Sequence, residues 1–189
     1  MAENDVRGAS ARDAAFVARS QLLTSEEVSR SLRRIAHEIL EHTNDVADLV
    51  IVGLQTGGVA FASHLASDLS AITGQSVRSG QLDVAFYRDD LARNPTPTLS
   101  STVMEHDLTD RVVVVVDDVL YTGRTVRAAL NALSDWGRPR AVRLAVMVDR
   151  GHRELPIRPD FVGKNLPTSS DEAIVATLEG VWIGTKGPS

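Results

Sequence analysis

The stretch V-V-V-V-V-D-D-V-L-Y-T-G-R-T at residues 112–125 decides the fold of this chain. Five consecutive valines make up its first part. Because the side chains of a strand point alternately to opposite faces, such a run predicts a strand that is buried on both faces. Strands of this kind lie inside parallel sheets that helices cover on both sides. We therefore expect an α/β fold with a central, mostly parallel sheet flanked by helices.

The second part of the stretch carries side chains that can bind a ligand. Asp117 and Asp118 follow the valines, at the carboxyl end of the predicted strand, where open α/β sheets bind their ligands. Residues 122–125 then open a helix predicted over 126–134, whose first-turn N–H groups attract an anion. The stretch predicts a site for a sugar phosphate, with two acids for hydroxyls or a cation and a cup of amides for the phosphate.

A buried strand, a polar turn and a helix capped by Thr122 or Thr125 form the plain alternative, which many unrelated proteins contain. This alternative leaves the two adjacent acids unexplained, because like charges repel unless a ligand or a metal uses them. A P-loop is excluded, since Gly123 has neither the glycine spacing nor the lysine which that motif requires.

Length and composition bound the remaining possibilities. We expect a disordered tail over residues 1–19, which are poor in large apolar side chains, and a single domain over 20–189. The absence of cysteine excludes disulfides, thiolate metal sites and a cysteine nucleophile. No apolar run approaches the roughly 18 residues of a membrane span, and the first residues lack the apolar core of a signal peptide. We therefore expect a cytoplasmic protein without a membrane partner.

Charge is unevenly distributed along the chain. The net charge of −5 argues weakly against a dedicated nucleic-acid binder, since such domains are usually basic. Residues 138–164, however, hold seven basic and three acidic side chains. A helix predicted over 24–41 also carries a polar stripe opposite its apolar face, made of Arg30, Arg33, Arg34 and His37. From spacing alone, this stripe is most simply a solvated helix face.

A second glycine-rich turn, G-L-Q-T-G-G at residues 53–58, lies between a strand predicted over 48–52 and a helix predicted over 59–72. Its amides can point to the ligand edge of the sheet, although a tight connection is the plain alternative. Residues 90–108 form a long polar segment with two prolines, which is either a lid over the site or an ordinary surface loop.

The remaining elements follow from the same patterns. We expect extended structure over 76–87, a buried strand over 141–148 and a final pair of strands over 173–183. The segments 149–158 and 161–168 are expected as turns after a strand's carboxyl end, from which they can reach the ligand.

The run of apolar residues, acidic pair and T-G-[KR]-T resembles the phosphoribosyl-diphosphate motif of type I phosphoribosyltransferases. Within that superfamily the chain resembles the PyrR family over about residues 24–183. The segment at 148–158 is far more specific than the shared phosphate motif. Five segments carry the resemblance: I-A-H-E-I at 35–39, Y-R-D-D-L at 87–91, D-D-V-L-Y-T-G-R-T at 117–125, V-D-R-G-H-R-E-L-P-I-R at 148–158 and G-K-N-L-P-T at 163–168.

The resemblance implies a type I phosphoribosyltransferase fold with a small hood, and two activities. One is conversion of uracil and 5-phosphoribosyl-1-diphosphate (PRPP) to uridine monophosphate (UMP) and diphosphate with Mg²⁺. The other is binding of a stem-loop in the leader mRNA of pyrimidine genes, which uridine nucleotides (UMP or UTP) strengthen and which attenuates expression. A homodimer or higher homo-oligomer is implied as well.

By matching position, the resemblance also assigns roles to residues. Tyr121 stands where purine-using relatives carry an aspartate base. The catalytic residues would be Asp117, Asp118, Tyr121 and Arg88, with the two aspartates reaching the metal through substrate or water. The substrate-binding residues would be Thr56, Gly57, Gly58, Val119, Leu120, Thr122, Gly123, Arg124, Thr125, Asp149 and Arg150. The RNA-binding residues would be Arg33, Arg34, His37 and Arg150.

The diphosphate loop departs from the family pattern. It is commonly T-R-G, whereas this chain has Thr56-Gly57-Gly58, so the charge of the arginine is missing. A charge-assisted hydrogen bond contributes about 1.5 to 3 kcal/mol, or roughly ten- to a hundredfold in binding. We therefore expect weak transferase activity, with nucleotide binding retained.

Two functions stay open. The first is a nucleotide-responsive RNA-binding regulator with some transferase activity, and the alternative is mainly a uracil salvage phosphoribosyltransferase without RNA regulation. A leader stem-loop upstream of pyrimidine genes would favour the first. A purine or orotate phosphoribosyltransferase is disfavoured by Tyr121 and by the segment at 148–158.

Overall fold

The computed structural model describes residues 16–43, 45–87, 102–104 and 107–186. Their elements, in chain order, are β1 (Phe16–Thr24), α1 (Ser25–Glu41), η1 (Val46–Asp48), β2 (Leu49–Leu54), α2 (Gly58–Thr73), β3 (Arg78–Leu82), η2 (Ala85–Tyr87), β4 (Val112–Leu120), α3 (Arg124–Leu133), η4 (Ser134–Trp136), β5 (Ala141–Asp149), β6 (Phe161–Asn165), β7 (Glu172–Thr177) and β8 (Gly180–Lys186). None of the helices among these residues is long and apolar enough to cross a membrane.

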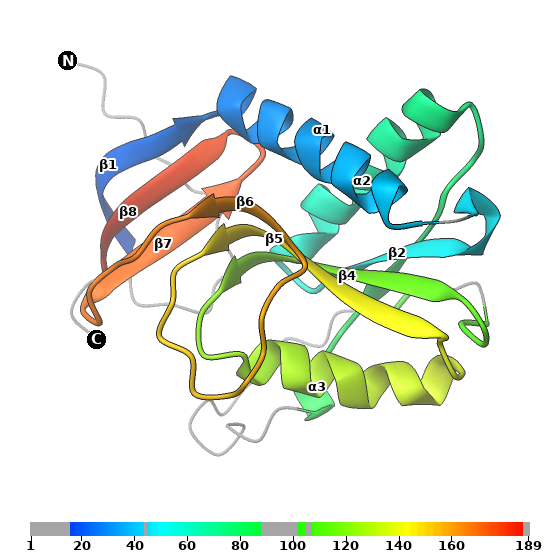
Figure 1. The fold of residues 1–189 in the computed structure, drawn as a ribbon. Coiled ribbons are helices and arrows are strands. Elements are labelled where there is room, and N and C mark those ends of the chain that lie inside the picture. The colour runs from blue at the N-terminus through cyan, green and yellow to red at the C-terminus, as the bar shows by residue number, and fades with distance from the viewer. Residues whose placement is uncertain (1–15, 44, 88–101, 105–106, 187–189) are drawn as a thin grey trace.

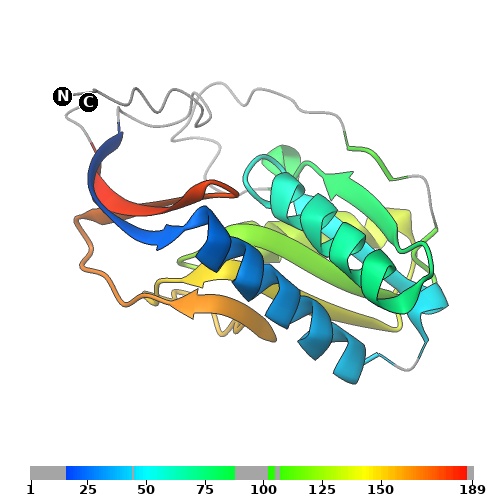
Figure 2. The same cartoon turned by 90° about the horizontal axis from the view of Figure 1, so that it is seen from above.

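A parallel sheet in the order β3-β2-β4-β5-β6 forms the centre of the molecule, with β4 in the middle. Helices α1 and α2 cover one face and α3 covers the other (Figures 1 and 2). Val112, Val114 and Val116 pack into the apolar core on the α1 and α2 side, whereas Val113 and Val115 pack into the core on the α3 side. The α/β fold and the double-sided burial predicted from the valine run are therefore confirmed.

Helix α1 begins where its sequence provides a cap. The Thr24 hydroxyl accepts a hydrogen bond from the Glu27 amide at 3.3 Å, and the Glu27 carboxylate accepts one from the Thr24 amide at 2.8 Å. This reciprocal pair satisfies two amides that the first turn leaves without carbonyl partners. The buried side chains of α1 recur at three- and four-residue spacing, at Val28, Leu32, Ile35, Ala36 and Ile39. The predicted amphipathic helix is thus present.

A second, antiparallel sheet in the order β1-β8-β7 forms the hood. It lies beyond the carboxyl ends of the central strands (Figure 1). The final strand pair was predicted, but β1 was not: residues 16–19, expected in a disordered tail, begin this strand. Most side chains of β1 are exposed, and the strand is held by backbone pairing with β8, which apolar periodicity does not reveal.

Two other expectations change with the structure. The segment 161–168 was expected as a turn, but its first part is β6, the parallel edge strand beside β5. The extended segment expected over 76–87 is shorter, since β3 ends at Leu82 and a 3₁₀ turn, η2, follows. The candidate lid over 90–108 lies mostly outside the described residues.

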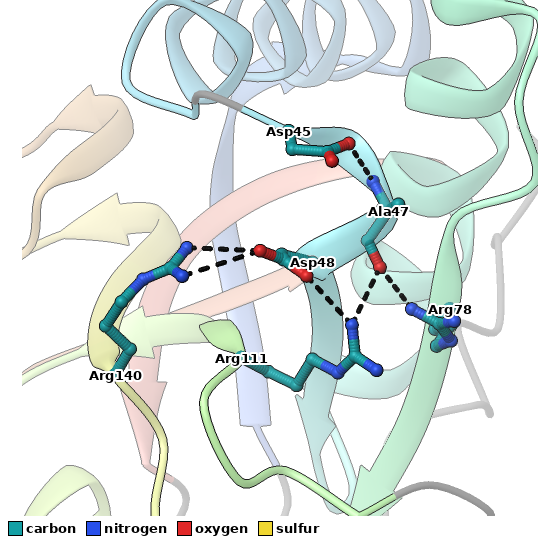
Figure 3. A network of polar contacts seen from close by, with 6 residues as sticks. All are labelled: Asp45, Ala47, Asp48, Arg78, Arg111 and Arg140. Carbon is teal, nitrogen blue, oxygen red and sulfur yellow. Dashed lines mark hydrogen bonds and ion pairs between the residues drawn. The ribbon is translucent and has the colours of Figure 1, made fainter.

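Three arginines converge on η1 at the amino end of the sheet (Figure 3). They stand at or just before the starts of β3, β4 and β5. Asp48 accepts from Arg111 at 2.9 Å through one carboxylate oxygen and faces Arg140 at 3.4 Å through the other. The Ala47 carbonyl accepts from Arg111 and from Arg78. This acidic turn, which leads into β2, therefore ties together the starts of β3, β4 and β5.

We expect Asp48→Ala to lower the free energy of unfolding by about 1 kcal/mol at low salt, because it leaves two cations, Arg111 and Arg140, without their shared carboxylate. Urea titration measures this change, and it should shrink at about 1 M salt, where exposed charges are screened. Asp48→Asn is the matched control, since it keeps an acceptor for Arg111 and removes only the charge. An unchanged stability of Asp48→Asn, or losses that do not depend on salt in either variant, would show that the ion pairs contribute nothing.

Candidate functional site

The predicted phosphate loop lies between β4 and α3. Gly123 has φ +92° and caps α3, which begins at Arg124. This left-handed conformation favours glycine, so the abrupt turn into the helix depends on the residue type. The Arg124 amide donates to the Thr122 hydroxyl at 3.4 Å. The amides of this loop and of the first helical turn are the groups that the sequence predicted as a cup for an anion, and this role stays a prediction.

Both acids of the motif lie within β4, which continues to Leu120. Asp117 is only 7% exposed and its carboxylate accepts from the Asp118 amide at 3.0 Å. Asp118 is half-buried, and its carboxylate accepts from the Val119 amide at 2.7 Å. Burial raises the pKa of Asp118, and hydrogen bonds from Asp117 and the backbone offset this only in part. A cation or a hydroxyl donor beside Asp118 would stabilise its charged form.

The glycine-rich loop after β2 lies against the acidic pair. A Cβ atom added to Gly57 would stand 2.2 Å from an Asp118 carboxylate oxygen, and one added to Gly58 would stand 2.1 Å from the Val116 carbonyl oxygen. The Gln55–Thr56 peptide bond is cis, and the Gln55 amide donates to the Leu82 carbonyl at 3.0 Å. The structure therefore brings the glycine-rich loop against the acidic pair of β4, which directly precedes the predicted phosphate loop in the chain.

Tyr121 contacts two side chains of the segment after β5. The Arg150 guanidinium sits 4.2 Å from the centre of the Tyr121 ring, a cation–π contact. The rings of His152 and Tyr121 are in a T-shaped contact, with their centres 5.7 Å apart. Arg150 also donates to the Thr168 hydroxyl at 3.0 Å and to the Glu172 carbonyl at 2.7 Å. These contacts tie the central sheet to the hood directly over the end of β4.

Arg150 is only 7% exposed, and its donors are directed at hood residues. Its predicted place in the substrate site fits this position, whereas its predicted contact with RNA does not, because little of the side chain reaches the surface. Asp149 is half-buried and its carboxylate accepts from the Gly151 amide at 2.9 Å. Val119 and Leu120 complete the same end of β4, and Arg88 lies outside the described residues.

Sequence reasoning missed how the segment 149–157 meets the phosphate loop. The Thr122 carbonyl accepts from the amides of Glu154 and Leu155 at 3.1 and 3.3 Å. Arg124 pairs with the Glu154 carboxylate at 2.7 Å. The high specificity of this segment was visible in the sequence, but no pattern in it indicated which backbone groups it would contact.

The stripe on α1 is exposed at all three predicted RNA positions, Arg33, Arg34 and His37. Arg34 differs from the other two because it reaches the neighbouring strand. Its guanidinium donates to the Val162 and Gly163 carbonyls at 2.9 and 2.8 Å and pairs with Glu38 at 2.5 Å. Arg34 therefore holds α1 to β6.

Comparison with known proteins places this geometry in a family. Residues 18–178 match the phosphoribosyl transferase domain. The chain is 52% identical over 162 residues to the "Bifunctional protein PyrR" of Deinococcus radiodurans, covering 85% of this chain and 88% of the relative. It is 55% identical over 163 residues to the protein of the same name from Herpetosiphon aurantiacus, covering 85% and 90%.

Solved structures agree on the fold. The hypoxanthine phosphoribosyltransferase of Trypanosoma cruzi superposes with a TM-score of 0.69 at 20% identity, over 89% of this chain and 98% of that one. A hypoxanthine phosphoribosyltransferase of Staphylococcus aureus gives 0.67 at 19% identity, over 90% and 94%. The predicted type I phosphoribosyltransferase fold is thus confirmed. With its fold and with relatives about half identical over most of their length, the chain belongs to the phosphoribosyl transferase domain family and, within it, to the PyrR family.

Proposed function

We propose that the protein converts uracil and PRPP to UMP and diphosphate, and that it binds the leader mRNA of pyrimidine genes in response to uridine nucleotides. The transferase function is supported mainly by one observation. The loop at 55–58 lies against the acids of β4, and the predicted cup at 122–125 directly follows these acids in the chain. A substrate with a diphosphate, ribose hydroxyls and a 5′-phosphate needs these three groups side by side.

The roles follow from this order. Asp117 and Asp118 accept from the ribose hydroxyls, residues 122–125 bind the 5′-phosphate, and residues 56–58 face the diphosphate, with Arg88 closing on it. The bond from C1 of the ribose to the diphosphate oxygen breaks, and diphosphate leaves with the electron pair. A bond from C1 to N1 of uracil forms and the N1 proton is released. Because positive charge develops on the ribose, catalysis rests on positioning and fixed dipoles.

Mg²⁺ fits the donors of this site. The ion prefers oxygen ligands, keeps several waters and is usually held by one or two carboxylates together with substrate phosphates. Asp117 and Asp118 offer such carboxylates, and the raised pKa of Asp118 is what a nearby cation would reverse. Across the described part of the chain, no group of three or more metal-binding side chains could hold the ion alone. When bound with substrate, Mg²⁺ neutralises charge on the diphosphate.

The end of β4 is the place for uracil in this proposal. Tyr121 contacts both Arg150 and His152, while Val119, Leu120 and Asp149 lie at the same end of the sheet. A neutral phenol at this position suits a base whose ring N–H is acidic enough to need little help. We therefore keep Arg150 with the base site and leave it out of the RNA surface.

The stripe on α1 supports the RNA function. Arg33 and His37 are exposed, and Lys164 extends the stripe onto β6. The pKa of Glu27 is lowered, first by its hydrogen bond with the Thr24 backbone and further by the charges of Arg30 and Lys164, which places both cations near one end of the stripe. A local basic face can bind RNA phosphates although the whole chain is acidic. A messenger as partner places the protein in the cytoplasm, and the homo-oligomer stays a prediction.

Salvage without RNA regulation is the second candidate. Arg34 favours it in one respect, because its guanidinium is directed at Glu38 and at two carbonyls of β6. The stripe therefore presents less free positive charge than the sequence indicated.

Gly57 variants separate charge from space in the diphosphate loop. We expect Gly57→Ala to weaken PRPP binding, because its Cβ would stand 2.2 Å from Asp118. Gly57→Arg adds the same Cβ together with the family's charge, so it should bind PRPP roughly ten- to a hundredfold more tightly than Gly57→Ala. Initial rates over a range of PRPP concentrations measure both. Equal PRPP affinities of the alanine and arginine variants would show that the missing arginine charge is not the cause of weak transferase activity.

Asp118→Asn should stabilise the unliganded protein at neutral pH. Since burial raises the folded pKa, stability falls as pH rises from the ordinary value of 3.8 towards that raised pKa, and the loss persists above it. Each unit of such a shift costs about 1.4 kcal/mol. Urea titrations across pH measure the effect, while UMP binding should weaken.

Asp107→Asn is the control of opposite sign, because a hydrogen bond from the Thr109 backbone lowers the pKa of Asp107. The stability that Asp107 contributes through its lowered pKa is present above the ordinary pKa and is lost as pH falls through the lowered pKa. Asp118→Asn with an unchanged pH profile would contradict the assignment.

Filter retention of the organism's own pyrimidine leader RNA tests the second activity. Arg33→Ala and His37→Ala should weaken binding, and Arg33→Ala should lower the slope of log K against log salt by about one. UMP should strengthen binding by the wild type. Arg138→Ala is the matched control, since Arg138 is exposed but lies near the amino ends of the strands. Equal loss in Arg33→Ala and Arg138→Ala, or indifference to UMP, would leave the salvage enzyme.

A further inference from the structure

Arg153 is the centre of the contacts between the segment after β5 and the end of β4. Its Nε donates to the Ile157 carbonyl at 2.9 Å, and its Nη1 donates to the Tyr121 carbonyl at 2.8 Å and the Gly151 carbonyl at 3.1 Å. Its Nη2 pairs with the Asp149 carboxylate at 2.5 Å. The side chain is only 19% exposed. Most of its five N–H donors are thus directed at the protein itself.

Three successive carbonyls at the end of β4 face this segment. The Leu120 carbonyl accepts from the Arg150 amide at 3.1 Å, and the Tyr121 carbonyl accepts from Arg153. The Thr122 carbonyl accepts from the amides of Glu154 and Leu155. On the same side, side-chain atoms of Leu155 and Ile157 stand 3.4 to 3.6 Å from where a Cβ of Gly123 would be.

These carbonyl bonds determine where the neighbouring amides point. A trans peptide unit is planar, with its C=O and the following N–H directed to opposite sides. Holding the carbonyls of residues 120–122 on the side of the segment therefore directs the amides of residues 121–123 to the other side. Of these, the amides of Thr122 and Gly123 belong to the loop at 122–125, which the proposed function assigns to the 5′-phosphate.

We propose that Arg153 is a positioning residue for phosphate recognition, which acts through the Tyr121 carbonyl by aiming the Thr122 amide, at the start of the loop at 122–125, rather than by touching the ligand or RNA. This inference rests on the proposed transferase function. The donors of Arg153 are directed at one carboxylate and at four backbone carbonyls, the fourth being that of Leu120 at 3.5 Å, so few of them are left for a phosphate. A planar fork is needed because the acceptors come from two strand ends and from the segment itself, and a single ammonium cannot reach them together.

The test compares UMP with uridine, which lacks the phosphate, by titration calorimetry. In the wild type, UMP should bind more tightly than uridine. Arg153→Lys keeps the charge beside Asp149 but loses the fork, so the UMP-to-uridine affinity ratio should fall roughly tenfold, with uridine affinity little changed. The KM for PRPP should rise more than kcat falls. Arg158→Lys, the same change at an exposed arginine of the same segment, should leave the ratio unchanged.

The outcomes separate this inference from the function on which it depends. A wild type that binds UMP no better than uridine, or lacks transferase activity, overturns the proposed function. An intact wild type whose ratio survives Arg153→Lys overturns only the role of Arg153. A general structural defect would weaken UMP and uridine alike, which also counts against the inference. If Arg153→Lys does not fold, Arg153→Gln, which keeps one amide donor for the Tyr121 carbonyl, serves in the same titration and should also lower the ratio.

Discussion

The burial of β4 on both faces is the constraint from which the rest of the structure follows. Its valines alternate between two apolar cores, so the strand cannot shift by one residue without exchanging every contact. The register to β2 and β5 is fixed with it. The acids at the end of the run are therefore held where apolar packing stops and the ligand edge begins, and burial there disfavours the charge of Asp118.

The sequence predicted those parts of the molecule whose cause is local. The valine run, the capping box of α1 and the glycine loops are each explained by a few neighbouring residues, and the structure has all of them. The meeting of Gly57 with Asp118 could be expected as well, because parallel strands end at one edge of the sheet.

Features that depend on distant partners could not be predicted from local patterns. β1 is mostly exposed and exists because β8 offers it backbone partners, and β6 is an edge strand whose short run has no clear alternation. Arg34 and Arg150 looked alike as basic residues near function. In the structure, Arg34 donates to carbonyls of β6 and Arg150 donates to the hood. No spacing along the chain could reveal this difference.

Strand β6 touches both places at which a ligand is proposed. Near its start, the Val162 and Gly163 carbonyls accept from Arg34 of the α1 stripe. Just beyond its end, the Leu166 amide donates to the Asp149 carbonyl and Thr168 receives Arg150, which stacks on Tyr121. Because linkage is reciprocal, any coupling free energy that β6 transmits between the proposed nucleotide and RNA sites must be the same in both directions. The edge strand β6 is thus in contact with residues of both the proposed nucleotide site and the proposed RNA site.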